Sequence, residues 1–157
     1  MLGFLPLFGT TLQPIDPYLL SLTTNRTVSV TRNVAVSTQT GKRASLEDIA
    51  RAAEGKRFVY IGEEHTNAES HRWQAWIIRA LHEAGRNVIV VVEMYQREKQ
   101  PVLNLWSYGK LTEEEFLEQS AWKNQWGFDF ALYRPIFEFV KDNRLRLVAL
   151  NIPRDWV

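Results

Sequence analysis

Residues 58–65 read Phe-Val-Tyr-Ile-Gly-Glu-Glu-His, and the expected fold is organised around this stretch. Its first four residues are aromatic or β-branched, which is typical of a strand. A glycine, two carboxylates and a histidine follow, and then a helix start. We therefore predict a strand over 57–62 and a helix over 67–84 that ends at Gly85, with a capping box at 66–69.

Two further stretches predict strands of the same sheet. Residues 87–92, Asn-Val-Ile-Val-Val-Val, are apolar on both faces, as in the centre of a parallel sheet that helices cover. Residues 146–150, Arg-Leu-Val-Ala-Leu, predict the third strand. Helices are expected between them at 98–108, after a capping box that opens at Thr112, and at 132–143. This order predicts an α/β fold, a parallel sheet with βαβαβ units and flanking helices.

The first third of the chain is less regular. Residues 1–33 contain three prolines and no sustained periodicity, so we expect an irregular N-terminal arm with a strand near 27–31. A short strand at 33–36 and a helix over 46–53 capped by Ser45 follow. We therefore divide the chain into an arm, 1–33, and an α/β domain, 34–157.

Composition argues against several partners and chemistries. A net charge of +1, from 19 basic and 18 acidic residues, provides no field that favours nucleic acid. The absence of cysteine removes disulfides, thiolate nucleophiles and a lipidated cysteine. No secretory signal is visible, and no stretch approaches the roughly 20 apolar residues of a membrane span. Location is thus left open, and any membrane association is not encoded in this chain.

Ionisable side chains follow the expected strands at one edge of the sheet, where ligands bind in such folds. Glu63 and His65 follow the first strand and Glu93 the second, and a histidine with two carboxylates suits a divalent ion. His71, in the first helical turn, could lean toward them. Because Glu93 directly follows an apolar run, we expect it to be half-buried and paired. The alternative is that this cluster only caps a helix and pairs with an arginine.

The aromatic residues allow two interpretations. Tyr95 is expected outside the strand, facing the same edge as Glu93. The other aromatic residues of the second half are more typical of a core than of a cofactor pocket; they are Trp122, Trp126, Phe128, Phe130 and Tyr133.

Five motifs follow one another along the chain: Gly62 to His65, Glu93 to Arg97, Trp126 to Phe128, Tyr133 to Pro135 and Leu150 to Arg154. In this order, and over a stretch from about Val36 to the last residue, they resemble the ChaN-like haem-binding uptake proteins of the Tiki superfamily. The resemblance implies a bacterial haem-binding protein of iron acquisition in the cell envelope, with a tyrosine on the iron and two haems stacked in a homodimer. Members of the wider superfamily with a similar Gly-Glu-x-His motif are metal-dependent proteases or hydrolases.

The resemblance implies site residues for a non-enzymatic haem-binding protein, the function we expect. Tyr95 or Tyr133 is the candidate iron ligand, and Trp126, with Phe128, would lie against the porphyrin. Arg97 or Arg154 would face a propionate.

The hydrolase alternative uses the other cluster. Glu63, His65 and Glu93 would then hold a divalent metal ion that activates water, and would be the catalytic residues. Family members usually extend beyond the last motif, whereas this chain stops three residues after Arg154. We therefore expect an incomplete family domain whose third strand lies at an open sheet edge.

Overall fold

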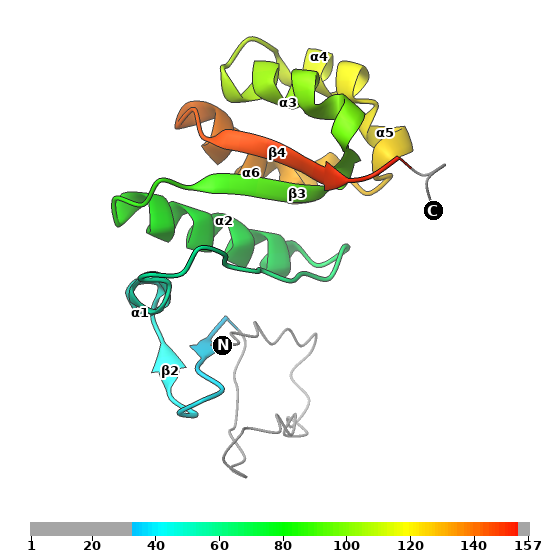
Figure 1. The fold of residues 1–157 in the computed structure, drawn as a ribbon. Helices are drawn as coiled ribbons and strands as arrows, with labels where there is room; N and C mark the ends of the chain where they lie inside the picture. The colour runs from blue at the N-terminus through cyan, green and yellow to red at the C-terminus, as the bar shows by residue number, and fades with distance from the viewer. Residues whose placement is uncertain (1–32, 154–157) are drawn as a thin grey trace. The chain divides into compact units, whose positions relative to one another are not determined.

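The computed structural model describes residues 33–153. The strand expected near 27–31 lies outside the described residues, as does Arg154. The chain divides into two compact units, residues 1–84 and residues 85–157. Their positions relative to one another are not determined, and each is described by itself (Figure 1).

The described part of the first unit contains a small hairpin and two helices. The strands β1 (Ala35–Val36) and β2 (Arg43–Ala44) pair antiparallel. Helix α1 (Leu46–Ala52) begins at the predicted cap, where Ser45 and Asp48 form a capping box. Helix α2 (Ala68–Glu83) follows. The sequence predicted β1 and α1, whereas β2 was missed because two residues carry no periodicity.

The strand predicted over 57–62 was wrong. In the described part of the first unit the strands are β1 and β2, which pair with each other. Residues 57–62 therefore have no ladder partner within the described part of their unit, although their composition suits a strand. Phe58 and Tyr60 are 72% and 88% exposed. An apolar segment thus leads into α2 without pairing with another described strand of its unit.

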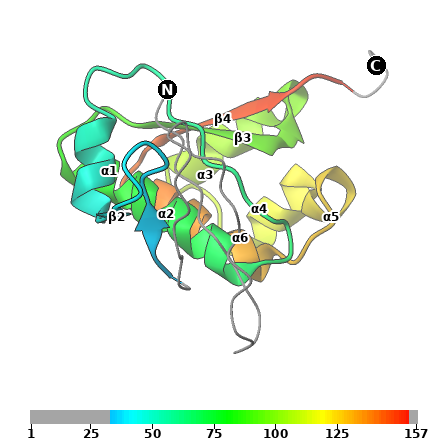
Figure 2. The same ribbon diagram turned by 90° about the horizontal axis from the view of Figure 1, so that it is seen from below.

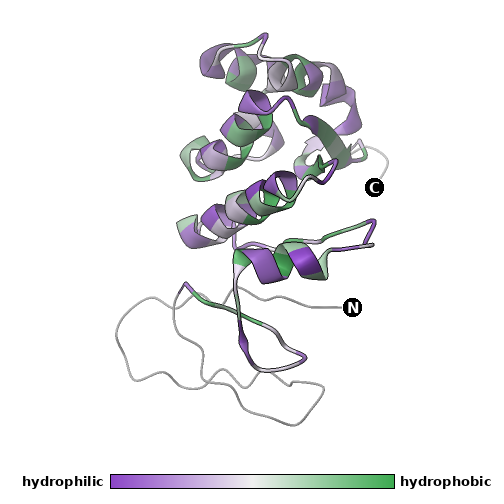
Figure 3. Cartoon of the chain, turned by 90° about the vertical axis from the view of Figure 1, so that its left-hand side faces the viewer, coloured by the Kyte–Doolittle hydropathy of each residue, from purple (hydrophilic) through white to green (hydrophobic). Residues whose placement is uncertain are grey.

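Helix α2 has nearly the predicted bounds, but a different cap. Asn67 is the N-cap residue, and its side chain accepts a hydrogen bond from the backbone N–H of Glu69 at 3.0 Å. The cap thus lies one residue after the expected Thr66. At the other end Gly85 has a φ of +76°, a conformation that favours glycine. Figure 3 shows hydrophilic and hydrophobic residues alternating along the helices.

The second unit is the α/β part of the chain. Strands β3 (Ile89–Gln96) and β4 (Arg146–Asn151) lie side by side and pair in parallel, flanked by helices (Figures 1 and 2). The predicted fold class is confirmed, with a parallel sheet of two described strands instead of three. Between the strands come η1 (Arg97–Lys99), α3 (Gln100–Ser107), α4 (Glu113–Ser120), α5 (Trp122–Gln125) and α6 (Phe130–Asp142).

An aromatic core holds these helices to the sheet. The Phe116 ring of α4 lies 4.5 Å from the Trp106 ring of α3 and 5.5 Å from the Phe137 ring of α6, between ring centroids. All three residues are fully buried. The indole N–H of Trp106 donates to the carbonyl oxygen of Phe137 at 2.8 Å, so the polar atom of this buried ring is satisfied.

Arg134 joins α6 to α4 at the surface. Its guanidinium donates two hydrogen bonds, of 2.7 and 2.8 Å, to the carboxylate of Glu113. These hydrogen bonds hold the pKa of the Glu113 carboxyl below its usual value. The Tyr-Arg-Pro motif therefore contributes a helix-to-helix ion pair at this position.

Gln100 covers part of the outer edge of β4. Its side-chain N–H donates to the carbonyl oxygen of Leu147 at 2.8 Å, and its side-chain oxygen accepts from the backbone N–H of Ala149 at 2.9 Å. One amide thus takes the place of a neighbouring strand over two residues. The edge predicted to be open is partly satisfied by a side chain.

We expect Gln100→Leu to lower the free energy of unfolding by about 1–3 kcal/mol, because it leaves two backbone groups of β4 without partners. Urea denaturation measures the change. The control is Asn104→Ala, which removes only the 2.8 Å hydrogen bond between the side chains of Gln100 and Asn104. It should cost no more than about 0.5 kcal/mol. Equal losses would show that Gln100 does not support the edge.

Candidate functional site

The register of the sheet breaks at its carboxyl edge. Val92 pairs with Ala149, but the next pair is Gln96 with Asn151, so four residues on β3 oppose two on β4. Such irregularities bend a strand and redirect its side chains, and they are frequent beside functional sites. Strict alternation of buried and exposed residues ends where this break occurs.

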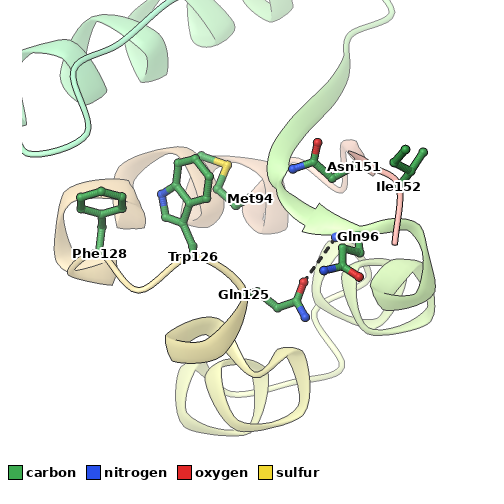
Figure 4. Close-up of a pocket in the computed structure, with 7 residues that line it drawn as sticks. All are labelled: Met94, Gln96, Gln125, Trp126, Phe128, Asn151 and Ile152. Atoms are coloured by element: carbon green, nitrogen blue, oxygen red, sulfur yellow. Dashed lines mark hydrogen bonds between the residues drawn. The ribbon is translucent and has the colours of Figure 1, made fainter. Parts of the chain in front are cut away.

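A pocket of about 450 Å³ opens where the strands separate (Figure 4). This volume lies within the range of small-molecule and cofactor sites. Its position at the carboxyl ends of β3 and β4 is the edge at which the sequence predicted a ligand. The lining residues are Met94 and Gln96 from β3, Gln125 from α5, Trp126 and Phe128 after α5, and Asn151 and Ile152 at the end of β4.

Hydrogen bonds between side chains and backbone hold the walls of this pocket. The side-chain N–H of Asn151 donates to the carbonyl oxygen of Glu93, which joins the two strands at the break. The backbone N–H of Gln96 donates to the side-chain oxygen of Gln125 at 3.4 Å, which joins β3 to α5 (Figure 4). Gly127 has a φ of +86°, and this turn allows Trp126 and Phe128 on either side of it to line the same pocket.

Tyr95 does not face this pocket, and the expectation that it lies outside the strand was wrong. It belongs to β3 and is fully buried, directly after the buried Met94, because the break in register turns both residues inward. Its hydroxyl donates to the side-chain oxygen of Ser120 at 2.9 Å. Burial raises the pKa of the Tyr95 phenol well above its usual value.

Tyr133 is buried, yet it is hydrogen-bonded to a residue that lines the pocket. The residue is fully buried, as expected for a core aromatic. Its hydroxyl oxygen, however, accepts a hydrogen bond of 2.8 Å from the indole N–H of Trp126, which lines the pocket. A single indole therefore connects the phenol of Tyr133 to the pocket wall.

The charged residues that the structure describes in the second unit lie outside the pocket lining. Arg97 is exposed in η1, next to the pocket residue Gln96. Glu93 is exposed, so the expectation of half-burial was wrong. The reason is its place in the alternation, since Glu93 shares a face of β3 with Ile89 and Val91, which are also exposed.

A second polar cluster lies in the first unit, around the Glu63 carboxylate. One carboxylate oxygen lies beside Nδ1 of His65, and the other lies 3.6 Å from Nε2 of His71. The Glu63 side chain is 5% exposed and that of His71 is fully buried. The structure therefore brings Glu63 and His65 together, and adds His71 from the first turn of α2.

Gln74 fixes the orientation of His71, a role that was not predicted from the sequence. Its side-chain N–H donates to the carbonyl oxygen of Ile61 at 3.2 Å, so its oxygen faces Nδ1 of His71 at 3.1 Å. Nε2 of His71 lies 3.1 Å from the carbonyl oxygen of His65. The spacing of three residues between His71 and Gln74 on a helix was the available signal.

The metal site predicted at Glu63, His65 and Glu93 stays a prediction. Glu63 and His65 belong to the first unit and Glu93 to the second. The three residues remain a sensible donor set by chemistry, with two carboxylates and one imidazole. What the first unit itself shows is a carboxylate between two histidines.

We expect His71→Ala to lower the free energy of unfolding by about 1–3 kcal/mol, because the His65 carbonyl and the Gln74 amide lose their partner. The matched control is His82→Ala, in the last turn of the same helix. It should change stability by no more than about 0.5 kcal/mol. Both are measured by urea denaturation followed by circular dichroism. Equal effects of the two variants would contradict a supporting role for His71.

Comparison with known proteins places the chain in a family. No helix in the part of the chain that the structure describes is long and apolar enough to cross a membrane. Neither the curated proteins nor the solved structures contain a significant match. The model of one family, described as haem-binding uptake, Tiki superfamily, ChaN, matches residues 49–157. Since this match covers more than half of the sequence, the chain belongs to the ChaN haem-binding uptake family of the Tiki superfamily.

Proposed function

We propose that this chain binds haem in the pocket at the carboxyl edge of β3 and β4, as a non-enzymatic component of bacterial haem and iron acquisition. The observation that carries the proposal is the pocket itself, which combines aromatic rings with polar amides in a family named for haem binding. Trp126 and Phe128, whose ring centroids are 5.7 Å apart and whose planes are inclined by 58°, supply apolar rings that can pack against a face and an edge of the macrocycle.

The polar side of the pocket suits the carboxylates of haem. Gln96, Gln125 and Asn151 carry amide N–H groups that can donate to a propionate. Exposed Arg97 follows the pocket residue Gln96 directly and is one candidate cation for binding a propionate. Arg154, by its place in the sequence, is the other candidate. The residues present therefore fit haem, with apolar rings on one side and hydrogen-bond donors on the other.

Tyr133 is the better placed of the two candidate tyrosine ligands. Its phenol is one hydrogen bond from the pocket residue Trp126, so rotation of one indole would open a path to it. The Tyr95 phenol instead donates to Ser120 in the core, and Tyr95 is not among the residues that line the pocket. We therefore propose Tyr133 as the ligand of ferric iron, and a homodimer as the haem-loaded state.

Haemin titration of the apo-protein tests this function. We expect a saturable shift of the Soret band, with the spectrum of a tyrosinate ligand. Tyr133→Phe should lose that spectrum and at least about tenfold in affinity, since even outer-shell partners of metal ligands contribute this much. Tyr95→Phe is the matched control and should keep both.

Size-exclusion chromatography of the same samples tests dimerisation. The haem-loaded protein should elute at twice the mass of the apo-protein. Spectra that match free haemin throughout the titration would contradict haem binding. An unchanged spectrum of Tyr133→Phe would contradict only the choice of ligand.

The alternative function is a metal-dependent hydrolase, favoured by the nearly buried Glu63 between His65 and His71. Under this proposal Glu63, His65 and Glu93 hold a divalent ion that activates water. Protein purified without chelators should then contain about one bound divalent ion per chain, and His65→Ala should lose it. Metal analysis that finds no bound ion in the parent protein would exclude this alternative.

A further inference from the structure

Met94 is the lining residue of the pocket with a donor atom suited to iron. The other six lining side chains offer amides, an indole, a phenyl ring and an aliphatic group. Figure 4 shows Met94 on the same side of the pocket as Trp126, opposite Asn151 and Ile152. A thioether is a soft ligand, and methionine is an established axial ligand of haem iron in proteins.

The residues directly before and after Met94 are both held in place by other parts of the second unit. The next residue, Tyr95, is fixed by its hydrogen bond to Ser120 and by edge-to-face contacts with Phe116 and Trp122. The carbonyl of the preceding residue, Glu93, accepts a hydrogen bond from Asn151. Met94 itself is only 6% exposed. A side chain positioned in this way can bind a metal without large rearrangement.

We propose that the Met94 sulfur is a ligand of the iron of haem bound in this pocket, and that it favours the ferrous state. This inference rests on the haem-binding function proposed above. Thioether ligation raises the reduction potential of haem, because the soft sulfur stabilises the reduced iron. Tyrosinate favours ferric iron as a hard anionic ligand, so the two ligands would separate the two oxidation states.

The chain offers a direct test, because its two methionines are Met1 and Met94. Selenomethionine labelling leaves the fold intact and replaces the Met94 sulfur with selenium. X-ray absorption at the iron edge of the reduced, haem-loaded protein should then show a sulfur neighbour in the ordinary protein and a selenium neighbour in the labelled protein. Identical iron environments in the two samples would overturn the proposal.

Met94→Leu provides the second measurement, since this exchange conserves volume and is well tolerated in cores. The full-length variant should bind ferrous haem at least about tenfold more weakly. Its reduction potential should shift to a more negative value, while its ferric spectrum stays that of the parent. Val91→Leu is the matched control, since Val91 is an exposed residue of the same strand outside the pocket lining, and it should change neither quantity.

The outcomes separate this inference from the haem-binding proposal. Haem binding with the same potential and the same ferrous affinity in Met94→Leu and the parent would overturn the role of Met94 alone. Failure of the parent protein to bind haem would overturn both. A loss confined to the ferrous state in Met94→Leu supports both.

Discussion

The break in register between β3 and β4 is the feature on which the candidate site depends. Two extra residues on β3 separate the strands after Val92, and the side chain of Asn151 closes the break by donating to the Glu93 carbonyl. A regular parallel ladder would have kept Met94 and Tyr95 on opposite faces. With the break, both point into the second unit, one lining the pocket and the other packed in the core.

The rest of the second unit keeps this edge rigid. The aromatic core fixes Tyr95, since the centroid of the Tyr95 ring lies 5.8 Å from that of Trp122 and 6.4 Å from that of Phe137. Gln100 satisfies the outer edge of β4, and Gln125 ties α5 to the end of β3. Met94, Gln96, Gln125 and Asn151 therefore lie on packed strands and a helix, which is what precise ligand binding requires. The other lining residues, Trp126, Phe128 and Ile152, lie in the segments that follow these elements.

The sequence predicted elements better than side-chain directions. Apolar runs and capping boxes are local signals, so β4, α1 and α2 were found close to their bounds and the start of α4 was found at its capping box. The strand β3 was found as well, but it ends four residues after its predicted end. Apart from the short strand β2, the main failures were matters of pairing. Residues 57–62 have the composition of a strand but lack a partner in the described part of their unit, and composition does not encode partners.

For the candidate site, too, the location was predicted and the directions of individual side chains were not. The carboxyl edge of the sheet followed from parallel topology, and the position of Trp126 in a motif pointed to the pocket. The burial of Tyr95 and the exposure of Glu93 could not be predicted, because the register break is set by pairing with β4, far along the chain. Met94 was not predicted as a site residue, since a methionine at the end of an apolar strand is ordinarily a core residue.

Paramagnetic NMR of the protein loaded with haemin tests the central claim most directly, since ferric iron broadens the signals of nearby nuclei. Haem bound at the carboxyl edge of β3 and β4 should broaden the side-chain amide signals of Gln96, Gln125 and Asn151 first. The side-chain amide signal of Gln74, which lies in the first unit, serves as the comparison. Broadening confined to Gln74 and its neighbours, with the pocket amides unaffected, would contradict the account.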